Sequence, residues 1–434
     1  MWVLVQALVI GLVVLCLAAC DPAPLLPTPA PDVETAVPPT SQPQQTQAVD
    51  PLPAPEIITL TVWTTELFSP TQMFTGGQIL VQQVVQFKEA HADAALEFVV
   101  KKPYGKGGIL DYLLATQSVV PDLLPDLVLI DVDELGTAVQ AGLLQPLDDW
   151  VPTELKEDLY PAIRQSNSYD GRLYGLQVFA DLEHLVYNTG KLTVSPRSWP
   201  GVLSNPGPYI FPAGGEAGLA NDAFWIQYLA VAPAPSNASE RQSTLDEEGL
   251  ISVFQYYQEG LTRGIFPSAI QSYHGVDDCW KQYQAGAAVL SHVNSHLYLR
   301  DRQSIASTSA ALIPGSSGPA ASINQGWTLA LVADDPVRQA LASDFALRMM
   351  APDVNAAWNR SARYLPTRQT ALAEWDPLDT YTSLARQLLE TAQPRLRLAN
   401  STQVSAAVQE AIENVLTRSL TPEEAAAWVI QEID

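Results

Sequence analysis

Aromatic and carboxylate side chains stand directly after two strand-like segments, residues 57–63 and 126–130. In open α/β sheets, ligands bind at the carboxyl ends of the strands, so these side chains are expected on a common rim. A tryptophan ring can cover an apolar face of a ligand, and carboxylates and hydroxyls can form hydrogen bonds with its polar groups. The residues concerned are Trp63, Thr64, Glu66 and Asp131.

Other residue pairs in the sequence fit catalysis or metal binding poorly. Tyr256 and Tyr257 are neighbours in an expected helix and diverge by about 100°, so core packing is the better interpretation. His292 and His296 have the i,i+4 spacing of zinc ligands, but their segment begins as a strand and lacks the glutamate of His-Glu-x-x-His. There is no Gly-x-Ser-x-Gly, no phosphate-binding loop and no Cys-x-x-Cys. We therefore expect no metal and no cofactor.

The composition favours a folded, acidic protein. The chain has 434 residues, 47% of them hydrophobic, and a formal charge of −24 from 23 Lys+Arg against 47 Asp+Glu. This length suits two or three domains with ample cores. Because acidic residues are spread over the whole chain and no basic cluster stands out, nucleic acid and anionic lipid headgroups are not expected as partners.

The first twenty residues indicate export from the cytoplasm. The apolar run Val3–Ala19 closes with Leu17-Ala18-Ala19-Cys20, which resembles the lipobox of bacterial lipoproteins, where the cysteine is acylated and the chain is cut before it. We therefore predict a signal peptide over residues 1–19, lipidation of Cys20, and an extracytoplasmic protein anchored to the bacterial cell membrane. An uncleaved anchor helix is the alternative. The proline-rich segment 20–56 is predicted to be a disordered tether.

Beyond the tether, strand and helix patterns alternate. This alternation, with an apolar strand at 126–130, indicates α/β lobes with mainly parallel sheets covered by helices. Asp133 could accept hydrogen bonds from a ligand at the same rim as Asp131, but a cap of a helix that begins near Glu134 is the favoured interpretation. Thr421 is expected to cap the last helix. Strands are expected at 57–63, 96–100, 126–130, 209–211, 287–290 and 328–332, and helices at 78–90, 108–118, 223–232, 249–264, 336–350, 380–391, 404–418 and 422–434.

Several short segments, taken in order, resemble one known family. They are Gly108-Ile109-Leu110 through Pro125-Asp126-Leu127-Val128, Tyr169-Asp170-Gly171-Arg172-Leu173-Tyr174-Gly175-Leu176 with Val186-Tyr187-Asn188, Gln325-Gly326-Trp327, and Arg363-Tyr364-Leu365-Pro366. Together they resemble the extracellular solute-binding proteins of ABC importers, in the branch of maltose- and other sugar-binding proteins. The sequence departs from the family pattern at three positions, which concern the hinge and the floor of the pocket. Gln177 stands where the family usually has proline, Gln325 replaces the first glycine of its Gly-Gly-Trp, and His296 lies about where it often has tryptophan.

The resemblance implies a two-lobed periplasmic-binding-protein-like fold of type II, with the ligand in a cleft between the lobes. Matching of segments gives an N-terminal lobe of 57–181 plus 327–364 and a C-terminal lobe of 182–326 plus 365–434. The chain would cross between the lobes near Asp181, Trp327 and Tyr364.

A sugar-binding cleft needs aromatic rings against the sugar faces and polar groups around the hydroxyls. Trp63 and Trp327 could supply rings, and Trp225 could do so or could pack in a helix core. Arg363 could pair with a ligand oxygen or could be a solvated surface charge. The remaining candidates near the crossings and on the opposite wall are Asp181, Asn294 and His296.

The resemblance also implies the role and the partners. We expect a monomeric, lipid-anchored receptor that captures a sugar or a related polyhydroxylated molecule and delivers it to an ABC permease. One alternative is a receptor that reports to a membrane signalling partner. Another is a secreted glycoside hydrolase that uses Asp131, although no second carboxylate pairs with it convincingly in the sequence.

Overall fold

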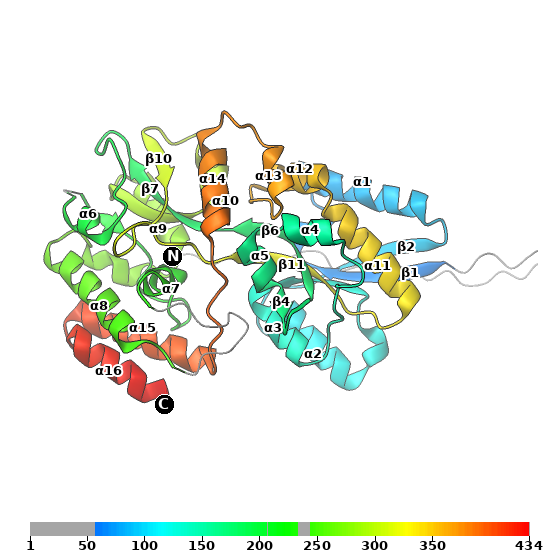
Figure 1. The fold of residues 1–434 in the computed structure, drawn as a ribbon, viewed down its shortest axis with the longest axis horizontal. Coiled ribbons are helices and arrows are strands. Elements are labelled where there is room, and N and C mark those ends of the chain that lie inside the picture. The colour runs from blue at the N-terminus through cyan, green and yellow to red at the C-terminus, as the bar shows by residue number, and fades with distance from the viewer. Residues whose placement is uncertain (1–56, 206, 233–243, 434) are drawn as a thin grey trace, which may run out of the picture. The chain divides into compact units, whose positions relative to one another are not determined.

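Two β-sheets, each covered by helices, organise the part of the chain that the structure describes (Figure 1). The computed structural model describes residues 57–205, 207–232 and 244–433, so the predicted signal peptide, Cys20 and almost all of the tether lie outside the described residues. No helix in the described ranges is both long and apolar enough to cross a membrane. The predicted α/β architecture with two lobes is confirmed.

The first sheet is buried on both faces because its central strand is apolar at nearly every position. Leu127 and Leu129 of β3 pack into one core, while Val128 and Ile130 pack into the core on the other face. This is the pattern expected when successive side chains point to opposite sides of a covered sheet. The strands, in spatial order, are β2 (Ala94–Val100), β1 (Ile58–Thr64), β3 (Leu127–Asp131), β11 (Gln325–Leu331) and β6 (Gly175–Asp181).

The second sheet lies in the other lobe and is smaller. Its strand β9 includes the buried polar residues Ser291 and His292. The sequence pattern missed this part of the strand because polar residues are not expected inside a buried strand. The predicted strand at 287–290 is therefore displaced: the observed strand starts at its last residue and continues to Asn294. The strands, in spatial order, are β10 (Thr308–Ala311), β7 (Glu183–Asn188), β9 (Leu290–Asn294) and β8 (Tyr209–Ile210).

Both sheets are mixed, which corrects the expectation of mainly parallel sheets. In the first, β1 is parallel to β2 and β3, but β11 runs antiparallel to both β3 and β6. In the second, β7 is antiparallel to β9 and β10, and only β8 and β9 are parallel. The reason is that β11 enters the first sheet after the chain has passed through the second lobe.

The eight predicted helices are present within three residues of their expected bounds, whereas others, such as Val276–Gln284 and Pro352–Ala362, were not predicted. Thr421 forms the predicted cap of the last helix: its hydroxyl accepts from the amide of Glu424, whose carboxylate accepts from the amide of Thr421. Helices associated with the first sheet are α1 (Thr75–Ala90), α2 (Ile109–Val119), α3 (Val132–Gln140), α4 (Thr153–Asp158), α5 (Pro161–Ser166), α11 (Pro336–Met349), α12 (Pro352–Ala362) and α13 (Gln369–Ala373). The others are α6 (Trp199–Leu203), α7 (Asp222–Leu229), α8 (Glu247–Thr262), α9 (Val276–Gln284), α10 (Ser295–Asp301), α14 (Thr380–Thr391), α15 (Ser401–Thr417) and α16 (Pro422–Ile433).

Smaller elements complete the description. A two-stranded ribbon precedes β6, and short 3-10 turns follow β1, α2 and the end of α8. The ribbon consists of β4 (Ser168–Tyr169) and β5 (Arg172–Leu173), and the turns are η1 (Glu66–Phe68), η2 (Pro121–Leu123) and η3 (Ser268–Ser272).

The predicted crossing segments meet at the end of β6. Gln325 is paired with Asp181, and Leu365 exchanges two backbone hydrogen bonds with Ala180. Beyond the predicted third crossing at Tyr364, the side chains of Arg368 and Trp375 donate to Asp158 and to the carbonyl of Ala356, which belong to helices beside the first sheet. The lobe boundaries stay a prediction.

Gln177 holds the crossing together from inside the protein. Its side chain is fully buried, and its amide nitrogen donates to the carbonyls of Phe179 and Gln325 and to the side-chain oxygen of Asn324. Its side-chain oxygen accepts from the amides of Asn167 and Asn324. A buried amide with all its groups bonded fixes the geometry of its surroundings, because breaking any one bond would leave a buried polar group unpaired.

Gly326, next to Gln325, is the position at this crossing where a side chain cannot fit. Its φ is +147°, and a Cβ built on it would lie 2.1 Å from the carbonyl oxygen of Phe179. We expect Gly326→Ala to lower the free energy of unfolding by about 3 kcal/mol, because the substitution combines backbone strain with a clash against main chain. Urea denaturation followed by circular dichroism would measure the change.

The matched control is Gly318→Ala. An added Cβ at Gly318 meets no atom within 4 Å, so we expect a change below about 1 kcal/mol. Equal losses in the two variants would contradict the assignment of strain to Gly326.

Candidate binding site

The predicted rim residues after β1 divide into two buried side chains and one exposed one. Trp63 is 6% exposed and packs edge-on against Tyr112, with the ammonium of Lys101 4.6 Å from its ring centroid. Thr64 is fully buried, and its hydroxyl donates to the carbonyl of Phe68. Glu66 is exposed and lines a cavity. The structure thus places Trp63 and Thr64 in the packing below the rim.

Trp327 and Tyr104 form an aromatic pair at the edge of the first lobe. Their ring centroids are 5.4 Å apart, and Tyr104 is 53% exposed. Together with Glu66 and Lys101 they line a cavity of about 680 Å³, which we call the aromatic cavity. Its volume lies within the range of small-molecule sites. Tyr104 was not among the predicted residues, although its place after β2, at the carboxyl end of a parallel strand, could have identified it.

A second cavity, of about 370 Å³, adjoins the first because Tyr104 borders both. It is lined also by Gln325 and by the acidic segment at the end of β3 and the start of α3, which consists of Asp131, Asp133 and Glu134, and we call it the acidic cavity. The phenol of Tyr104 donates to Asp131 at 2.5 Å. Asp131 is therefore already bonded at one oxygen.

The acidic segment also corrects the predicted helix cap. Asp131, and not Asp133, is the N-cap of α3: its other oxygen accepts from the amide of Asp133 at 2.8 Å. The helix begins at Val132, directly after the strand and two residues earlier than expected, so the last residue of the strand is itself the cap. Asp133 is free to project from the first turn of α3, where its carboxylate accepts from Arg395 at 2.7 Å.

Burial and mutual repulsion hold protons on this segment. Burial, followed by the nearby Asp133, raises the pKa of Asp131 to about 6. Burial, followed by Asp131 and Asp133, raises the pKa of Glu134 to about 7, and the Oε2 atom of Glu134 is buried without a hydrogen-bond partner in the described structure. The wall of the cleft is thus only partly ionised near neutral pH.

The opposite wall is formed by the start of α7. Asp222 is 8% exposed on its side chain and accepts two hydrogen bonds from Arg395 and one from Gln325. Trp225, one helical turn further, is 6% exposed and packs against Phe224 and Tyr228, so most of its ring serves the core. Its remaining surface borders a cavity of about 260 Å³ together with Arg395.

The other predicted site residues lie at the crossing and are bound to protein groups. Asp181 accepts from the hydroxyl of Ser295 and the amide of His296, and burial raises its pKa. Asn294 is the N-cap of α10 and accepts from the amide of Leu297. The ring of His296 stacks on Tyr364 at 4.4 Å between centroids. Within the described structure, these three residues organise the hinge.

Arg363 is exposed and terminates α12 in a left-handed conformation, with φ of 65°. The structure does not place it on any of the cavities described above, whose linings do not include it. The interpretation as a solvated surface charge, which the sequence left open, fits this position better than a ligand contact.

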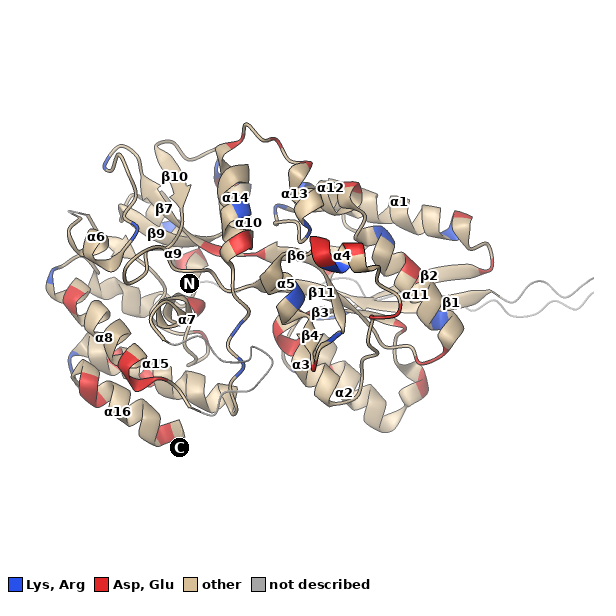
Figure 2. Ribbon diagram, in the orientation of Figure 1, with Lys and Arg blue, Asp and Glu red and all other residues tan. Residues whose placement is uncertain are grey.

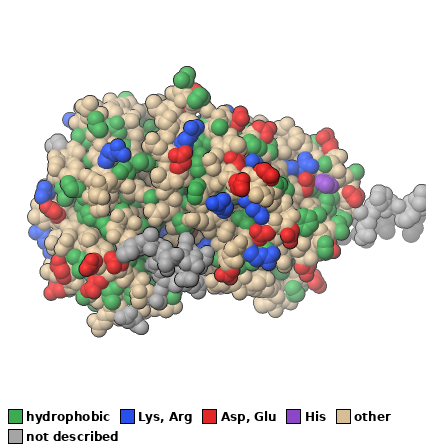
Figure 3. All heavy atoms as spheres, viewed as in Figure 1, with side chains coloured by type: hydrophobic (Ala, Val, Ile, Leu, Met, Phe, Trp, Pro, Cys, Tyr) green, Lys and Arg blue, Asp and Glu red, His purple; other side chains and the backbone are tan. Residues whose placement is uncertain are grey.

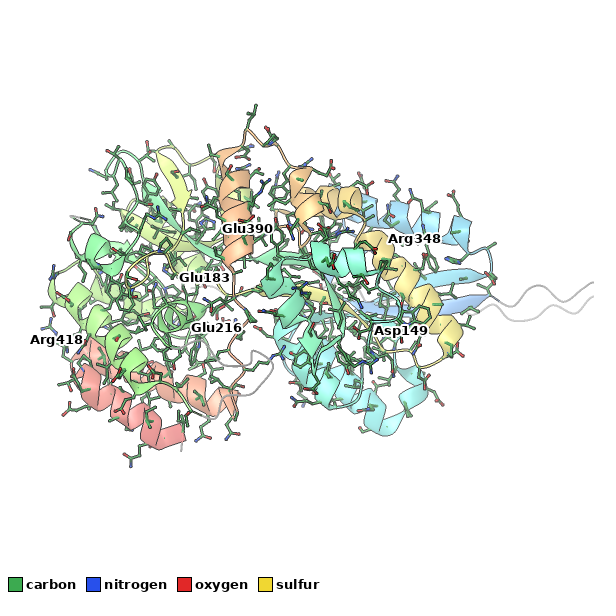
Figure 4. The ribbon with its side chains drawn as sticks, in the orientation of Figure 1. Asp149, Glu183, Glu216, Arg348, Glu390 and Arg418 are labelled. Carbon is green, nitrogen blue, oxygen red and sulfur yellow. The ribbon has the colours of Figure 1, made fainter. Side chains whose placement is uncertain are left out.

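The residue pairs that suggested catalysis or metals have structural partners. His292 is buried between Glu183, labelled in Figure 4, and the hydroxyl of Tyr209, at 3.0 and 2.6 Å. Tyr256 and Tyr257 are buried in the core, as predicted, and so is the unpaired Cys279. The described residues contain no group of three or more potential metal ligands.

Comparison with known proteins decides the family. Residues 82–384 match the sequence profile of the family described as bacterial extracellular solute-binding protein. The chain belongs to this family. The description of the family is that of a binding protein, which agrees with the expected binding role at the level of the family.

Individual relatives are more distant. The maltotriose-binding protein of Pyrococcus abyssi is 26% identical over 149 residues, which span a third of this chain and a third of the relative. The cyclic alpha-maltosyl-1,6-maltose binding protein of Arthrobacter globiformis matches in structure with a TM-score of 0.70 at 18% identity, over 87% of this chain and 98% of that one. The sugar-binding protein MalE of Xanthomonas citri matches with a TM-score of 0.70 at 15% identity, over 86% and 96% of the two chains. These structures show that the solute-binding protein has the maltose-binding type of fold.

The raised pKa of Glu134 makes stability depend on pH. A carboxyl group whose pKa is raised by folding binds its proton more tightly in the folded state, so its contribution to stability falls as pH rises through the folded value of about 7. We expect Glu134→Gln to be more stable than the wild type at pH 8 and to have a flatter dependence of stability on pH between about pH 5 and pH 8. Melting temperatures across this range would test it.

Glu89→Gln, at an exposed position of α1, is the control and should reproduce the wild-type dependence. If the curves of Glu134→Gln and of the wild type run parallel, the carboxyl group is not protonated in the folded protein near neutral pH.

Proposed function

We propose that this solute-binding protein captures a malto-oligosaccharide or a similar polyhydroxylated molecule between its lobes and delivers it to an ABC permease. We further propose that Cys20 carries the lipid that anchors it outside the cytoplasm, as a monomer. The observation that carries the ligand proposal is the Tyr104–Trp327 pair above the acidic segment of Asp131. Aromatic faces suit the C–H faces of sugar rings, and carboxylates suit their hydroxyls.

The comparisons support a sugar ligand. Two of the relatives named above bind maltotriose or a cyclic maltosyl-maltose according to their names, and the second of them has the same fold as this chain. The acidic surface supports an uncharged ligand better than a phosphorylated one, because a net charge of −24 repels anions. Figure 3 shows acidic and basic side chains interspersed over one face of the described part, without a large basic patch.

Capture would work by a shift between open and closed lobes. A ligand that contacts both walls only in the closed form adds its binding free energy to that form, so the closed population rises with ligand concentration. The membrane partner would recognise the closed form. The crossing at Gly326 and Gln177 is rigid, so the bending would have to be distributed over the connecting segments on either side of it.

Hydrolysis of a glycosidic bond is the less favoured activity. It needs two carboxyl groups that face each other across the bond. Asp131 shares its wall with Asp133 and Glu134, while Asp222 on the opposite wall is engaged by Arg395. In the described structure, the guanidinium group of Arg395 thus separates the carboxylate of Asp133 from that of Asp222.

A screen of ligand-dependent thermal stability tests the proposal. We expect maltose or longer malto-oligosaccharides to stabilise the full chain, whereas sugar phosphates and oligopeptides should have no effect. Ligand at about 100 times its dissociation constant should add roughly 2.7 kcal/mol to the free energy of unfolding. A response to peptides alone would assign the protein to a different class of solute.

The aromatic pair makes a second prediction about the same site. We expect Tyr104→Ala to weaken saccharide binding about tenfold or more, because it removes an exposed ring and the donor to Asp131. Titration calorimetry would measure the loss. Tyr104→Phe keeps the ring and removes only the hydroxyl, so it should lose less, and an equal loss in both variants would show that stacking contributes nothing.

A further inference from the structure

One cation joins the two walls of the cleft. The guanidinium of Arg395 donates from Nε to Asp133 at 2.7 Å, and from Nη1 and Nη2 to the two oxygens of Asp222 at 2.5 and 2.8 Å. Asp133 belongs to α3 in the first lobe and Asp222 to α7 in the second. We call this arrangement the Arg395 bridge. Two-point pairing of this kind is directional as well as strong, so it fixes the position of the guanidinium.

Contacts with other segments hold the chain in place on both sides of Arg395. Before it, the amide of Gln393 donates to the carbonyl of Ser322, and the carbonyl of Gln393 accepts from the amide of Asn324, which fastens the segment to the crossing. After it, Arg397 lies 3.8 Å from the ring centroid of Tyr169. Figure 2 shows basic residues on this connection between α14 and α15 and acidic residues at the start of α3. Arg395 is therefore part of a fixed segment that spans the cleft.

The bridge lies between two sets of cavities. On one side are the aromatic and acidic cavities, which share Tyr104. On the other side are the cavity of about 260 Å³ beside Trp225 and one of about 240 Å³ beside Tyr169, and Arg395 borders both. Asp133 borders the acidic cavity and both of these. The ion pairs of Arg395 with Asp133 and Asp222 therefore lie where the cleft is divided into two parts.

We propose that Arg395 determines the length of the saccharide that the cleft accepts, an inference that rests on the proposed function. With the bridge formed, a ligand is confined to the aromatic and acidic cavities, whose volumes of about 680 and 370 Å³ accommodate a short saccharide. A longer chain that continues toward Trp225 has to displace the guanidinium. Displacement leaves the partly buried Asp222 without its cation, which opposes binding.

Titration calorimetry with a series from maltose to maltoheptaose tests this proposal. For the wild type, we expect affinity to stop rising, or to fall, once the saccharide is longer than the two cavities on the Tyr104 side. For Arg395→Ala, we expect the affinity for the longest members to rise about tenfold or more relative to that for maltose. Arg263→Ala, which removes an exposed arginine paired with Glu259 on α8, should keep the wild-type length profile.

Arg395→Ala leaves the carboxylates of Asp133 and Asp222 facing each other without a cation, and their repulsion opposes folding. A second variant therefore separates an effect on binding from an effect on folding. Arg395→Met combined with Asp222→Asn removes the bridge and the repulsion together, and it should show the same gain for long saccharides. The proposal is overturned if either folded variant keeps the wild-type length profile, or if it loses affinity equally for every member. If no saccharide binds to any of the proteins, the proposed function fails and the length limit fails with it, whereas binding without a difference in length profile removes the length limit alone.

Discussion

The antiparallel insertion of β11 between β3 and β6 is the constraint on which the cleft depends. Its register places Trp327 opposite Asp131 and Gln325 opposite Asp181. A single strand thereby brings an aromatic ring to the acidic segment and fixes the point where the chain crosses between lobes. Since a shift of one residue would turn every side chain to the other face of the sheet, this register determines which groups the cleft presents.

The electrostatics of the cleft follow from the concentration of carboxylates at that edge. Asp131 and Glu134 on one wall are partly buried, and their pKa values are raised first by burial and then by the neighbouring carboxylates. Asp133 and Asp222 project from opposite walls, and Arg395 compensates both. The lobes can therefore approach each other only because a guanidinium group occupies the space between two carboxylates.

The positions where the sequence departs from the family pattern form one connected group. Gln177 bonds to Asn324 and to the backbone of Gln325, and the side chain of Gln325 bonds to Asp222 on the other wall. His296 stacks on Tyr364 beside Asp181. Polar side chains at these positions thus link the hinge to the cleft through hydrogen bonds, which proline or glycine at Gln177 and Gln325 could not form.

Eight of the helices and parts of six strands could be predicted from the sequence because local patterns determine them, whereas β6 and β7 were not predicted. The apolar alternation of β1 and β3, the amphipathic helices and the cap at Thr421 depend only on neighbouring residues. The failures have a physical reason too. His292 is a polar residue in a buried strand, and only its distant partners Glu183 and Tyr209 make that burial tolerable.

The site shows the same division between local and long-range information. Strand-end chemistry in the sequence identified Glu66 and Asp131, and the family resemblance added Trp327. Neither could tell that Trp63 is covered by Lys101 and Tyr112, since that depends on packing between elements. Nor could it reveal Arg395, which follows a helix and resembles any surface arginine until Asp133 and Asp222 converge on it. The sequence by itself determined the family, the elements and the acidic, aromatic character of the rim. Only the tertiary structure decided which of those side chains reach the cleft, because contacts between residues separated by scores to hundreds of positions arise only when the two sheets have formed.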